Sequence, residues 1–515
     1  MKILLVYPRY PETFWSFRHA LKFIGRKASF PPLGLLTVAA MLPGEWEKKL
    51  IDMNVHPLTD DDLTWADYVF ISAMVVQSES TKQVIKRCHR LGVKTVAGGP
   101  LFTACHEDFP EVDHLVLGEA ELTLPPFLSD LCNGRARHLY EAGQWADLTD
   151  TPVPLWDLVD VRNYAAMNIQ YCRGCPFDCE FCDITTLFGR RPRSKSLEQL
   201  IAELDNLHSR GWRGAIFFVD DNFIGDKEKL KREVLPAIID WMDRKEHPFY
   251  FYTEASINLA DDARLMELMV RAGFEEVFIG IETPYEESHT ESGKMQNRNR
   301  DLLASVRGIQ RAGLQVHGGF IVGFDSDPPS IFEQQIRFIQ ESGIVTAMVG
   351  LLSAIRGTRL HQRMILEGRL LGDETGNNMD SNLNFIPRME VNTLISGYRT
   401  ILDTIYSPKN YYQRVIRLLT EYRPLHQGKF HLQQGYVGAL FKSMLFLGVI
   451  GRERLHFWKL FFWSLIRKPR LFPLAITYAI YGFHFRKVAE KFRAGGMFDG
   501  NGQWNDKVGY GYKSN

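Results

Sequence analysis

Short apolar runs recur through the first 145 residues and are separated by stretches rich in polar positions. Alternation of this kind predicts an α/β fold in which a doubly wound parallel sheet carries helices on both faces. In such sheets, ligands bind beyond the carboxyl ends of the strands. The runs are Ile3–Tyr7, Leu33–Met41, Lys49–Asp52, Tyr68–Ala73, Thr81–Leu91, Thr95–Ala97 and Leu115–Leu117.

The loops that follow these runs carry small or short polar residues. Asp52, Ser72, the Gly98-Gly99 pair and Gly118 each lie at or just beyond the end of a separate run. Glycine lets the backbone approach a ligand closely, so these loops form a candidate binding edge. The simplest interpretation of the pattern alone is a flavodoxin-like nucleotide-binding domain.

A second alternation covers about residues 160–375. Ser196–Arg210 has the apolar spacing of a helix, and apolar or β-rich runs follow it with helical stretches between them. Six βα units predict a partial barrel, whose site should lie at the carboxyl ends of its strands. The runs are Ala215–Val219, Tyr250–Glu254, Val277–Ile281, Gln315–Val322 and Thr346–Leu352.

From about residue 390 the pattern becomes helical, and residues 452–493 contain ten Lys or Arg against two Asp or Glu. Basic and aromatic residues on helices suit an anionic bilayer surface, and a helical lid packed on the barrel is the alternative. The longest charge-free run, Leu471–Phe485, contains Pro473 and is shorter than the roughly 18–20 residues of a membrane-crossing helix. The aromatic residues are Phe457, Trp458, Phe461, Phe462, Trp463, Phe472, Tyr478 and Phe485.

The composition of the 515 residues, 45% hydrophobic and 24% charged, is that of two or three folded domains. Lys plus Arg equals Asp plus Glu, so bulk charge gives no indication of nucleic-acid binding. Met1–Pro8 is a short apolar run ended by proline, which predicts a buried strand and no signal peptide. We expect a cytoplasmic protein, with peripheral contact at the inner membrane face if the basic helices meet lipid.

Four of the seven cysteines fall within Cys172–Cys182, with the spacing Cys175-x3-Cys179-x2-Cys182. Three thiolates on one loop can hold three corners of a [4Fe-4S] cluster and leave the fourth iron open to a ligand. A structural zinc site is the competing interpretation. It is disfavoured because three residues separate the two Cys-x2-Cys pairs, whereas zinc ribbons use about 15–20.

This spacing, with the aromatic residue Phe181 before the last cysteine, resembles the signature of the radical S-adenosylmethionine (SAM) enzymes. The resemblance implies that Cys175, Cys179 and Cys182 ligate the cluster and that SAM binds the open iron. It also implies that Phe181 packs near the adenine of SAM. Cys172 lies outside the pattern and is interpreted as a non-ligand.

Polar residues fall at the ends of the predicted barrel strands. The resemblance implies that Asp220-Asp221 lies where the strand end meets the SAM amino group; a run at a helix N-terminus is the alternative. Glu254 and Glu282 close the next two strands, and carboxylates of this kind can accept hydrogen bonds from a ribose diol. We expect both in the SAM pocket, with a structural salt bridge as the alternative. Gly319 and Gly323, in Gly318–Gly323, resemble the element beside adenine.

The order Asp52, Ser72, Gly98-Gly99 resembles the cobalamin-binding domain attached to many radical SAM enzymes. It departs from the Asp-x-His-x-x-Gly pattern of that domain, because asparagine and proline stand at the histidine and glycine positions. The resemblance therefore implies cobalamin bound without a histidine ligand, with its tail near Ser72 and Gly98-Gly99. His56 is interpreted as a solvated loop residue.

Over most of its length the chain resembles cobalamin-dependent radical SAM proteins with a C-terminal helical domain, a group that includes hopanoid C-2 methyltransferases. The resemblance implies a cobalamin domain at 1–145, a radical SAM barrel at 160–375 and a helical domain at 390–495. It implies a C-methyltransferase acting on an unactivated carbon of a hydrophobic substrate such as a polycyclic isoprenoid lipid, with a separate electron donor. Relatives tend to have proline in place of Arg356, a departure expected to alter a loop facing the substrate.

Two other functions remain open from the sequence. The same cofactors would serve a methylase or radical cyclase that acts on a tetrapyrrole side chain. A non-catalytic cobalamin or redox sensor, using the helical tail to contact a partner, is the third hypothesis.

Overall fold

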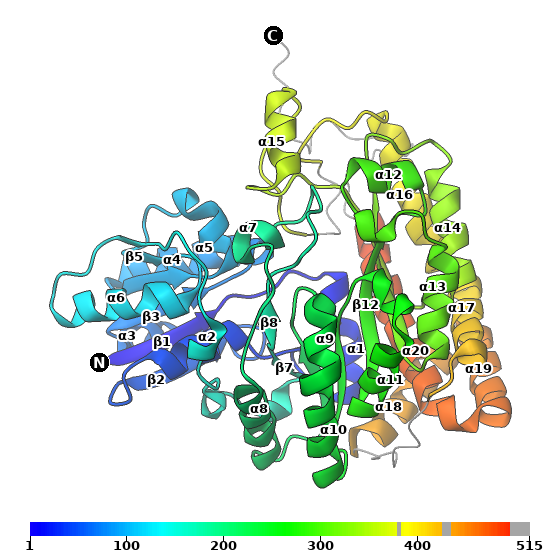
Figure 1. Ribbon diagram of the computed structural model, residues 1–515, viewed down its shortest axis with the longest axis horizontal. Helices are drawn as coiled ribbons and strands as arrows, with labels where there is room; N and C mark the ends of the chain where they lie inside the picture. Colours follow the sequence, from blue (N-terminus) through cyan, green and yellow to red (C-terminus); the bar gives the residue numbers. More distant parts are fainter. Residues whose placement is uncertain (378–382, 425–433, 495–515) are drawn as a thin grey trace.

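The computed structural model describes residues 1–377, 383–424 and 434–494, which form two parallel sheets and a C-terminal group of helices (Figure 1). The N-terminal sheet lies on the left of the view, and the second sheet lies beside it with helices α13, α14, α17 and α19 along its outer side. The fold class predicted from the sequence, α/β with a mostly helical C-terminal part, is confirmed.

The N-terminal sheet is all parallel, with the strand order β2-β1-β3-β4-β5-β6. Its strands are β1 Lys2–Tyr7, β2 Glu47–Asp52, β3 Tyr68–Ser72, β4 Lys94–Gly98, β5 His114–Val116 and β6 Leu139–Tyr140. Its helices are α2 Leu33–Met41, α3 Asp60–Trp65, α4 Ser78–Leu91, α5 Pro100–Cys105 and α6 Ala120–Cys132.

Both faces of this sheet are buried, which explains the uninterrupted apolar runs in its sequence. Leu4 and Val6 of β1 pack in one core cluster with residues of α3, α4 and α5. Ile3 and Leu5 point the other way, into a cluster that includes residues of α2 and α6. The helices therefore lie on both faces, as the doubly wound prediction requires.

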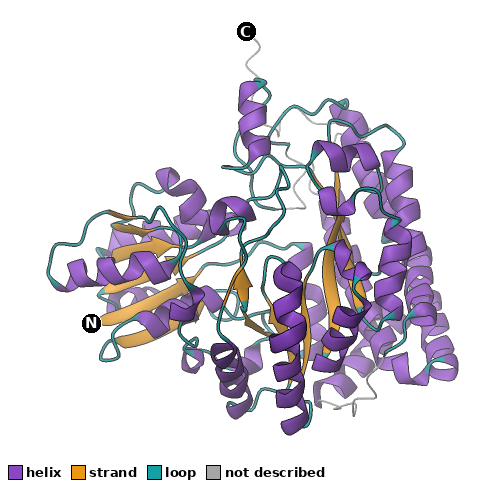
Figure 2. Ribbon diagram, in the orientation of Figure 1, coloured by secondary structure: helices purple, strands orange, loops and turns teal. Residues whose placement is uncertain are grey.

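The second sheet is also parallel and has the order β14-β13-β12-β11-β10-β7, an open arrangement that curves as part of a barrel (Figure 2). Its strands are β7 Met167–Ile169, β10 Gly214–Phe218, β11 Phe249–Glu254, β12 Phe274–Glu282, β13 Gln315–Val322 and β14 Ala347–Leu351. The helices between and after them are α8 Leu197–Ser209, α10 Leu235–Arg244, α11 Ala263–Ala272, α13 Leu302–Arg311, α14 Ile331–Ser342 and α15 Arg359–Leu366.

The C-terminal helices cover the β14 side of the barrel. Tyr398 donates a hydrogen bond to the Val349 carbonyl at 3.1 Å, and Tyr406 donates one to the Ala347 carbonyl. The helices are α16 Val391–Ile405, α17 Pro408–Glu421, α18 Gln434–Leu445, the π-helical η11 Phe446–Ile450, α19 Arg454–Arg467 and α20 Phe472–Ala494. No helix in the described ranges is long and apolar enough to cross a membrane.

Most aromatic residues that the sequence placed at a lipid surface lie in or against the core. Phe457, Tyr478 and Phe485 are buried, and that expectation is wrong for them because their helices pack on the barrel and on α1 (Arg18–Ile24). Phe462 is the only one of the eight that is exposed. For these rings the lid alternative describes the structure better.

Candidate active site

The three motif cysteines lie on the loop between β8 (Cys172–Arg173) and α7 (Ile184–Phe188), and all three are half-buried. Gly174 begins this loop with a φ of +93°, and a Cβ there would lie 3.0 Å from the Gly189 carbonyl oxygen. Only glycine fits this conformation without strain. The loop is therefore shaped by its glycine as well as by its cysteines.

The fourth cysteine, Cys172, is more deeply buried than the three motif cysteines. Its side chain is 3% exposed in the hydrophobic core, and its Sγ lies 3.8 Å from the Asn222 carbonyl oxygen. In the described residues no group of three His, Cys, Asp or Glu side chains could hold a single metal ion, so the four cysteines do not converge as a mononuclear site would require. The donor set of Cys175, Cys179 and Cys182 fits a larger cluster held at three corners.

Asp220 and Asp221 follow β10 and both support the cysteine loop. Asp220 is 1% exposed and accepts hydrogen bonds from the backbone N–H groups of Tyr171 and Cys172. Asp221 accepts one from the Gly174 N–H at 2.8 Å. Burial raises the pKa of Asp220 to about 8 and that of Asp221 to about 6. The Oδ2 atom of Asp220 is buried without a partner among the described residues.

Glu254 ends β11 with a carboxylate that has no hydrogen-bond partner in the part of the chain that the structure describes. Burial and the nearby Asp221 carboxylate raise its pKa to about 7. Glu254 is half-buried, and a carboxylate that is partly removed from water without a partner favours a bound cation or hydrogen-bond donor. The site therefore has negative charge available for a positively charged ligand such as SAM.

Glu282 ends β12 at a register shift, with a φ of +62° that is unusual for a residue other than glycine. Its Oε1 accepts a hydrogen bond from Lys294 Nζ at 2.6 Å, and both side chains are nearly buried. Burial opposes the charge on Lys294, but Glu282 and Cys179 outweigh it and raise the lysine pKa. Both the salt bridge and the pocket location that the sequence left open for Glu282 are therefore compatible with the structure.

Lys294 was missed by the sequence analysis. It lies on a loop, twelve residues after Glu282 and outside every motif, yet its Nζ is 5.9 Å from the centre of the Phe181 ring. The neighbouring Gln296 reaches the cluster loop, with its Nε2 3.9 Å from Cys179 Sγ. Only the fold brings this cation to the cysteines.

The Phe181 ring reaches the segment that follows β13. The Phe181 ring contacts Phe324 with centroids 6.0 Å apart, directly after Gly323, whose φ is +107°. A Cβ on Gly319 would lie 2.9 Å from Phe278, so this part of the strand has no room for a side chain. The loop after β13 is held by Asp327, which accepts from the Gly323 N–H at 2.9 Å.

The carboxyl ends of the N-terminal sheet are almost free of side chains. Ser72 ends β3 and Gly98-Gly99 follows β4; a Cβ on Gly98 would lie 2.6 Å from the Val116 carbonyl oxygen. A Cβ on Gly99 would overlap the Ser72 Oγ, and its φ is +85°. Nothing lies within 4 Å of a Cβ built on Gly118, after β5. These strand ends suit the approach of a wide, flat ligand.

Asp52 differs from the other residues of this edge. It is 3% exposed, and its two oxygens accept hydrogen bonds from the Asn54 N–H at 2.9 Å and the Tyr164 hydroxyl at 3.1 Å. Burial raises its pKa. Asp52 therefore joins the end of β2 to the segment that enters the barrel, while His56 is exposed.

A buried ion network joins the N-terminal domain to the short antiparallel pair of β8 and β9 (Arg193–Ser194), beside the cysteine loop. Arg173 Nη1 lies 2.9 Å from Glu119 Oε1, and its Nη2 lies 2.9 Å from Glu121 Oε1. Arg193 adds a contact of 2.9 Å to Glu119. Because Glu119 follows β5 and Arg173 precedes Cys175, the carboxyl ends of the first sheet lie against the cluster loop.

Arg356 forms a second connection between the same parts. Its Nη2 lies 2.7 Å from Asp373 and 3.4 Å from Asp108 of the N-terminal region. This arginine therefore ties the loop after β14 to the first sheet's domain, a role that proline could not have.

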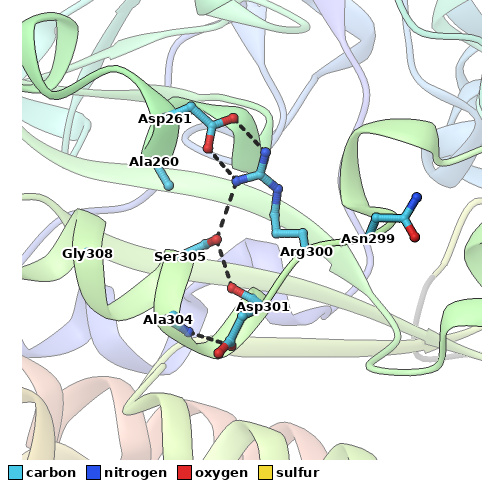
Figure 3. Close-up of a pocket in the computed structure, with 8 residues that line it drawn as sticks. All are labelled: Ala260, Asp261, Asn299, Arg300, Asp301, Ala304, Ser305 and Gly308. Carbon is cyan, nitrogen blue, oxygen red and sulfur yellow. Dashed lines mark hydrogen bonds and ion pairs between the residues drawn. The ribbon is translucent and has the colours of Figure 1, made fainter.

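A surface depression of about 410 Å³ lies apart from these residues. Figure 3 shows that Arg300 spans it to pair with Asp261, at 2.7 Å and 2.5 Å, and that Ser305 and Asp301 are joined by a hydrogen bond below. Its charges are already paired, and none of the residues predicted for the site lines it. The depression is therefore not the active site.

Comparison with known proteins agrees with this geometry. Residues 24–128 match the B12 binding domain, residues 169–339 match the radical SAM superfamily, and residues 358–496 match a domain of unknown function (DUF4070). The chain is 34% identical over 480 residues to the hopanoid C-2 methylase of Rhodopseudomonas palustris, covering 90% of each protein. The chain belongs to the cobalamin-dependent radical SAM family.

Two further relatives support this membership. An uncharacterized methyltransferase of Synechocystis is 40% identical over 495 residues, covering 95% of this chain and 92% of the relative. The structure of the radical SAM methyltransferase TsrM from Kitasatospora setae, with cobalamin and a [4Fe-4S] cluster bound, has a TM-score of 0.62 at 15% identity and shares the fold. It covers 95% of this chain and 99% of TsrM.

This radical SAM protein is a methyltransferase that uses a [4Fe-4S] cluster, SAM and cobalamin. Bound together, these cofactors supply reductive cleavage of SAM and transfer of a methyl group. The protein contributes the thiolates, the acidic strand ends that favour a cation, and the contact between the two sheets.

Proposed function

We propose that this enzyme methylates an unactivated carbon of a polycyclic isoprenoid lipid, in a reaction like that of hopanoid C-2 methylation. The supporting observation is the match to the hopanoid C-2 methylase, which extends over nine tenths of both chains. A hydrogen on the lipid carbon is replaced by a methyl group that derives from SAM, and a separate donor supplies electrons. Peripheral membrane contact belongs to the same proposal.

The proposal assigns a role to each predicted site residue. Cys175, Cys179 and Cys182 hold the cluster, and Phe181 with Gly319 and Gly323 borders the adenine of SAM. Asp221, Glu254 and the Glu282–Lys294 pair surround its charged groups, while Asp220 fixes the loop backbone. Ser72, Gly98 and Gly99 border cobalamin, with Asp52 holding the loop beside them. The domain limits 1–145, 160–375 and 390–495 remain part of this proposal.

The test is deletion of the coding sequence in its host, followed by mass spectrometry of extracted lipids and pigments. We expect one methyl branch to disappear from hopanoids and to return when purified, reduced, cobalamin-loaded protein and SAM are added to the extracted lipid. Loss of a methyl group from a tetrapyrrole would overturn the lipid proposal. A mass change without a gain of one methylene unit in the restored sample would overturn methylation. The sensor hypothesis is not retained, because the relatives are methyltransferases.

A further inference from the structure

Exposed hydrophobic side chains are concentrated in one segment of the C-terminal helices. Ten of the nineteen large hydrophobic residues that are exposed in the described part of the chain lie between residues 437 and 466. They are Val437, Phe441, Leu445, Phe446, Val449, Ile450, Leu455, Phe462, Leu465 and Ile466. We call this set the α18–α19 face. Concentrations of exposed apolar side chains of this kind mark interaction sites.

The spacing of these residues places them in rows. Val437, Phe441 and Leu445 are four residues apart on α18, and Val449 continues the row into η11. Side chains spaced in this way lie on one side of a helix. On α19, Leu455 and Ile466 share a row with Phe462, whose side chain is 53% exposed.

The two rows belong to packed neighbours. Trp458 of α19 donates a hydrogen bond from Nε1 to the Gly448 carbonyl of η11 at 2.9 Å. A Cβ on Gly448 would lie 3.1 Å from the rings of Phe457 and Trp458, so glycine permits this close packing. The buried ring of Phe457 fixes α19 against η11, and the exposed rows remain outside this contact.

The charges of the same segment have one sign. Residues 434–471 contain seven basic residues and a single acid, Glu453, which is 5% exposed and pairs with Arg486. Within the described ranges, none of the seven forms an ion pair with a carboxylate. The seven are Lys442, Arg452, Arg454, Lys459, Arg467, Lys468 and Arg470.

Apolar rows accompanied by unpaired cations fit an anionic lipid surface. The apolar side chains can reach the acyl boundary while the basic side chains meet phosphate groups. A second copy of the chain fits less well, because a two-fold interface would bring this positive charge against itself. No described helix can cross a bilayer, so the helices would lie in the plane of the interface.

We propose that the α18–α19 face docks this enzyme on an anionic membrane surface. The proposal deepens and rests on the proposed lipid methylation, since it places the enzyme where such a substrate resides. Most of the aromatic residues that the sequence placed at a lipid surface are not exposed. The α18–α19 face shares only Phe462 with them, and its other residues lie on α18, η11 and α19.

The test uses the full-length protein with its cofactors and two kinds of vesicle: phosphatidylcholine alone, and phosphatidylcholine mixed with phosphatidylglycerol. We expect sedimentation with the mixed vesicles only, weakening as salt is added. Phe441→Ser with Ile466→Ser, and separately Lys459→Glu with Arg467→Glu, should each reduce the partition coefficient by about tenfold or more. Unchanged circular dichroism and melting temperature confirm that the variants fold.

Matched control variants lie outside the face. Leu366→Ser removes a side chain of α15 that is 87% exposed, and Lys86→Glu reverses an exposed charge on α4. Both should bind vesicles like the wild type. Equal binding by the wild type and the face variants, or binding that ignores phosphatidylglycerol, would overturn the proposal. So would a dimer in solution that the face variants dissociate, because it would assign the face to a second copy.

The proposed lipid substrate and the proposed membrane docking can be rejected independently of each other. Vesicle binding through this face, combined with no change of hopanoids in the deletion strain, would leave docking intact and reject the lipid substrate. Methylation of detergent-dispersed hopanoid by a protein that ignores vesicles would retain the function and reject docking.

Discussion

The two parallel sheets have six strands each but present opposite chemistry at their carboxyl ends. Apart from the buried Asp52 at the end of β2, the N-terminal sheet ends in Ser72, Gly98 and Gly99, where side chains are small or absent. Two strands of the barrel sheet end in carboxylates, the half-buried Glu254 and the nearly buried Glu282. We infer that a side-chain-free edge serves a large flat cofactor and an acidic edge serves a sulfonium. On this inference, two parallel sheets of similar size bind different cofactors because different residues stand at the ends of their strands.

The largest effect is expected from substitutions in the cysteine loop. Cys179→Ala should remove SAM cleavage and product and lower the iron content, because three thiolates hold the cluster. Cys172→Ala is the matched control and should retain iron, since its side chain is buried in the hydrophobic core beside the Asn222 carbonyl. Iron analysis, electron paramagnetic resonance with added SAM and assay of 5'-deoxyadenosine provide the measurement. Deoxyadenosine formation by iron-reconstituted Cys179→Ala would contradict the assignment.

Breaking the acidic edge should have the next largest effect. Lys294→Met leaves the Glu282 carboxylate nearly buried without its cation, which costs roughly 3–5 kcal/mol of stability. SAM affinity should fall as well. Glu282→Gln combined with Lys294→Met should recover much of the stability but not the SAM affinity. Thermal unfolding and equilibrium dialysis measure the two quantities; recovery of both would show that the pair is only structural.

The glycine-rich strand ends of the N-terminal sheet can be tested by a single glycine-to-alanine substitution. Gly99→Ala should weaken cobalamin binding about tenfold or more, since this backbone conformation costs a residue other than glycine roughly 1–3 kcal/mol and the Cβ meets Ser72. Gly92→Ala is the control, with a φ of +69° and open space around the Cβ. Cobalamin titration followed by absorbance distinguishes them. Equal affinities in the two variants would remove Gly99 from the cobalamin site.

The smallest effect is a pH dependence at Glu254. Its pKa is raised from 4.5 to about 7, so the folded protein binds a proton that the unfolded chain releases, and this group lowers stability as pH rises between those values. Bound SAM should lower the pKa again. SAM affinity should therefore increase up to about tenfold between about pH 6 and pH 8. Titration calorimetry across this range should show that the SAM affinity of Glu254→Gln depends less on pH than that of the wild type. The same pH dependence in both proteins would place SAM away from Glu254.

The sequence predicts the local parts of this site well. Several strands end where the apolar runs end, as at Asp52 and Glu254, because buried parallel strands are continuous in hydrophobicity. The cysteine spacing and its aromatic residue are contained in eight positions, 175–182. Family membership and the three cofactors followed from these features and are confirmed.

Contacts between distant segments could not be predicted. Lys294 meets Glu282 through a loop without a motif, and Arg173 meets Glu119 across 54 residues and a domain boundary. The α18–α19 face was missed for a different reason. These helices are apolar on several sides, so their sequence does not reveal which side the barrel covers.

The open edge of the barrel has a consequence for truncation. Among the described residues, strand β14 pairs only with β13, and its carbonyls at Ala347 and Val349 accept hydrogen bonds from Tyr406, which follows α16, and from Tyr398 of α16. Arg414 of α17 caps the preceding carbonyl, Val345, at 3.2 Å. A chain cut before α16 would display these carbonyls as an unprotected strand, which invites intermolecular sheet formation. The helical region thus acts as a built-in guard against aggregation.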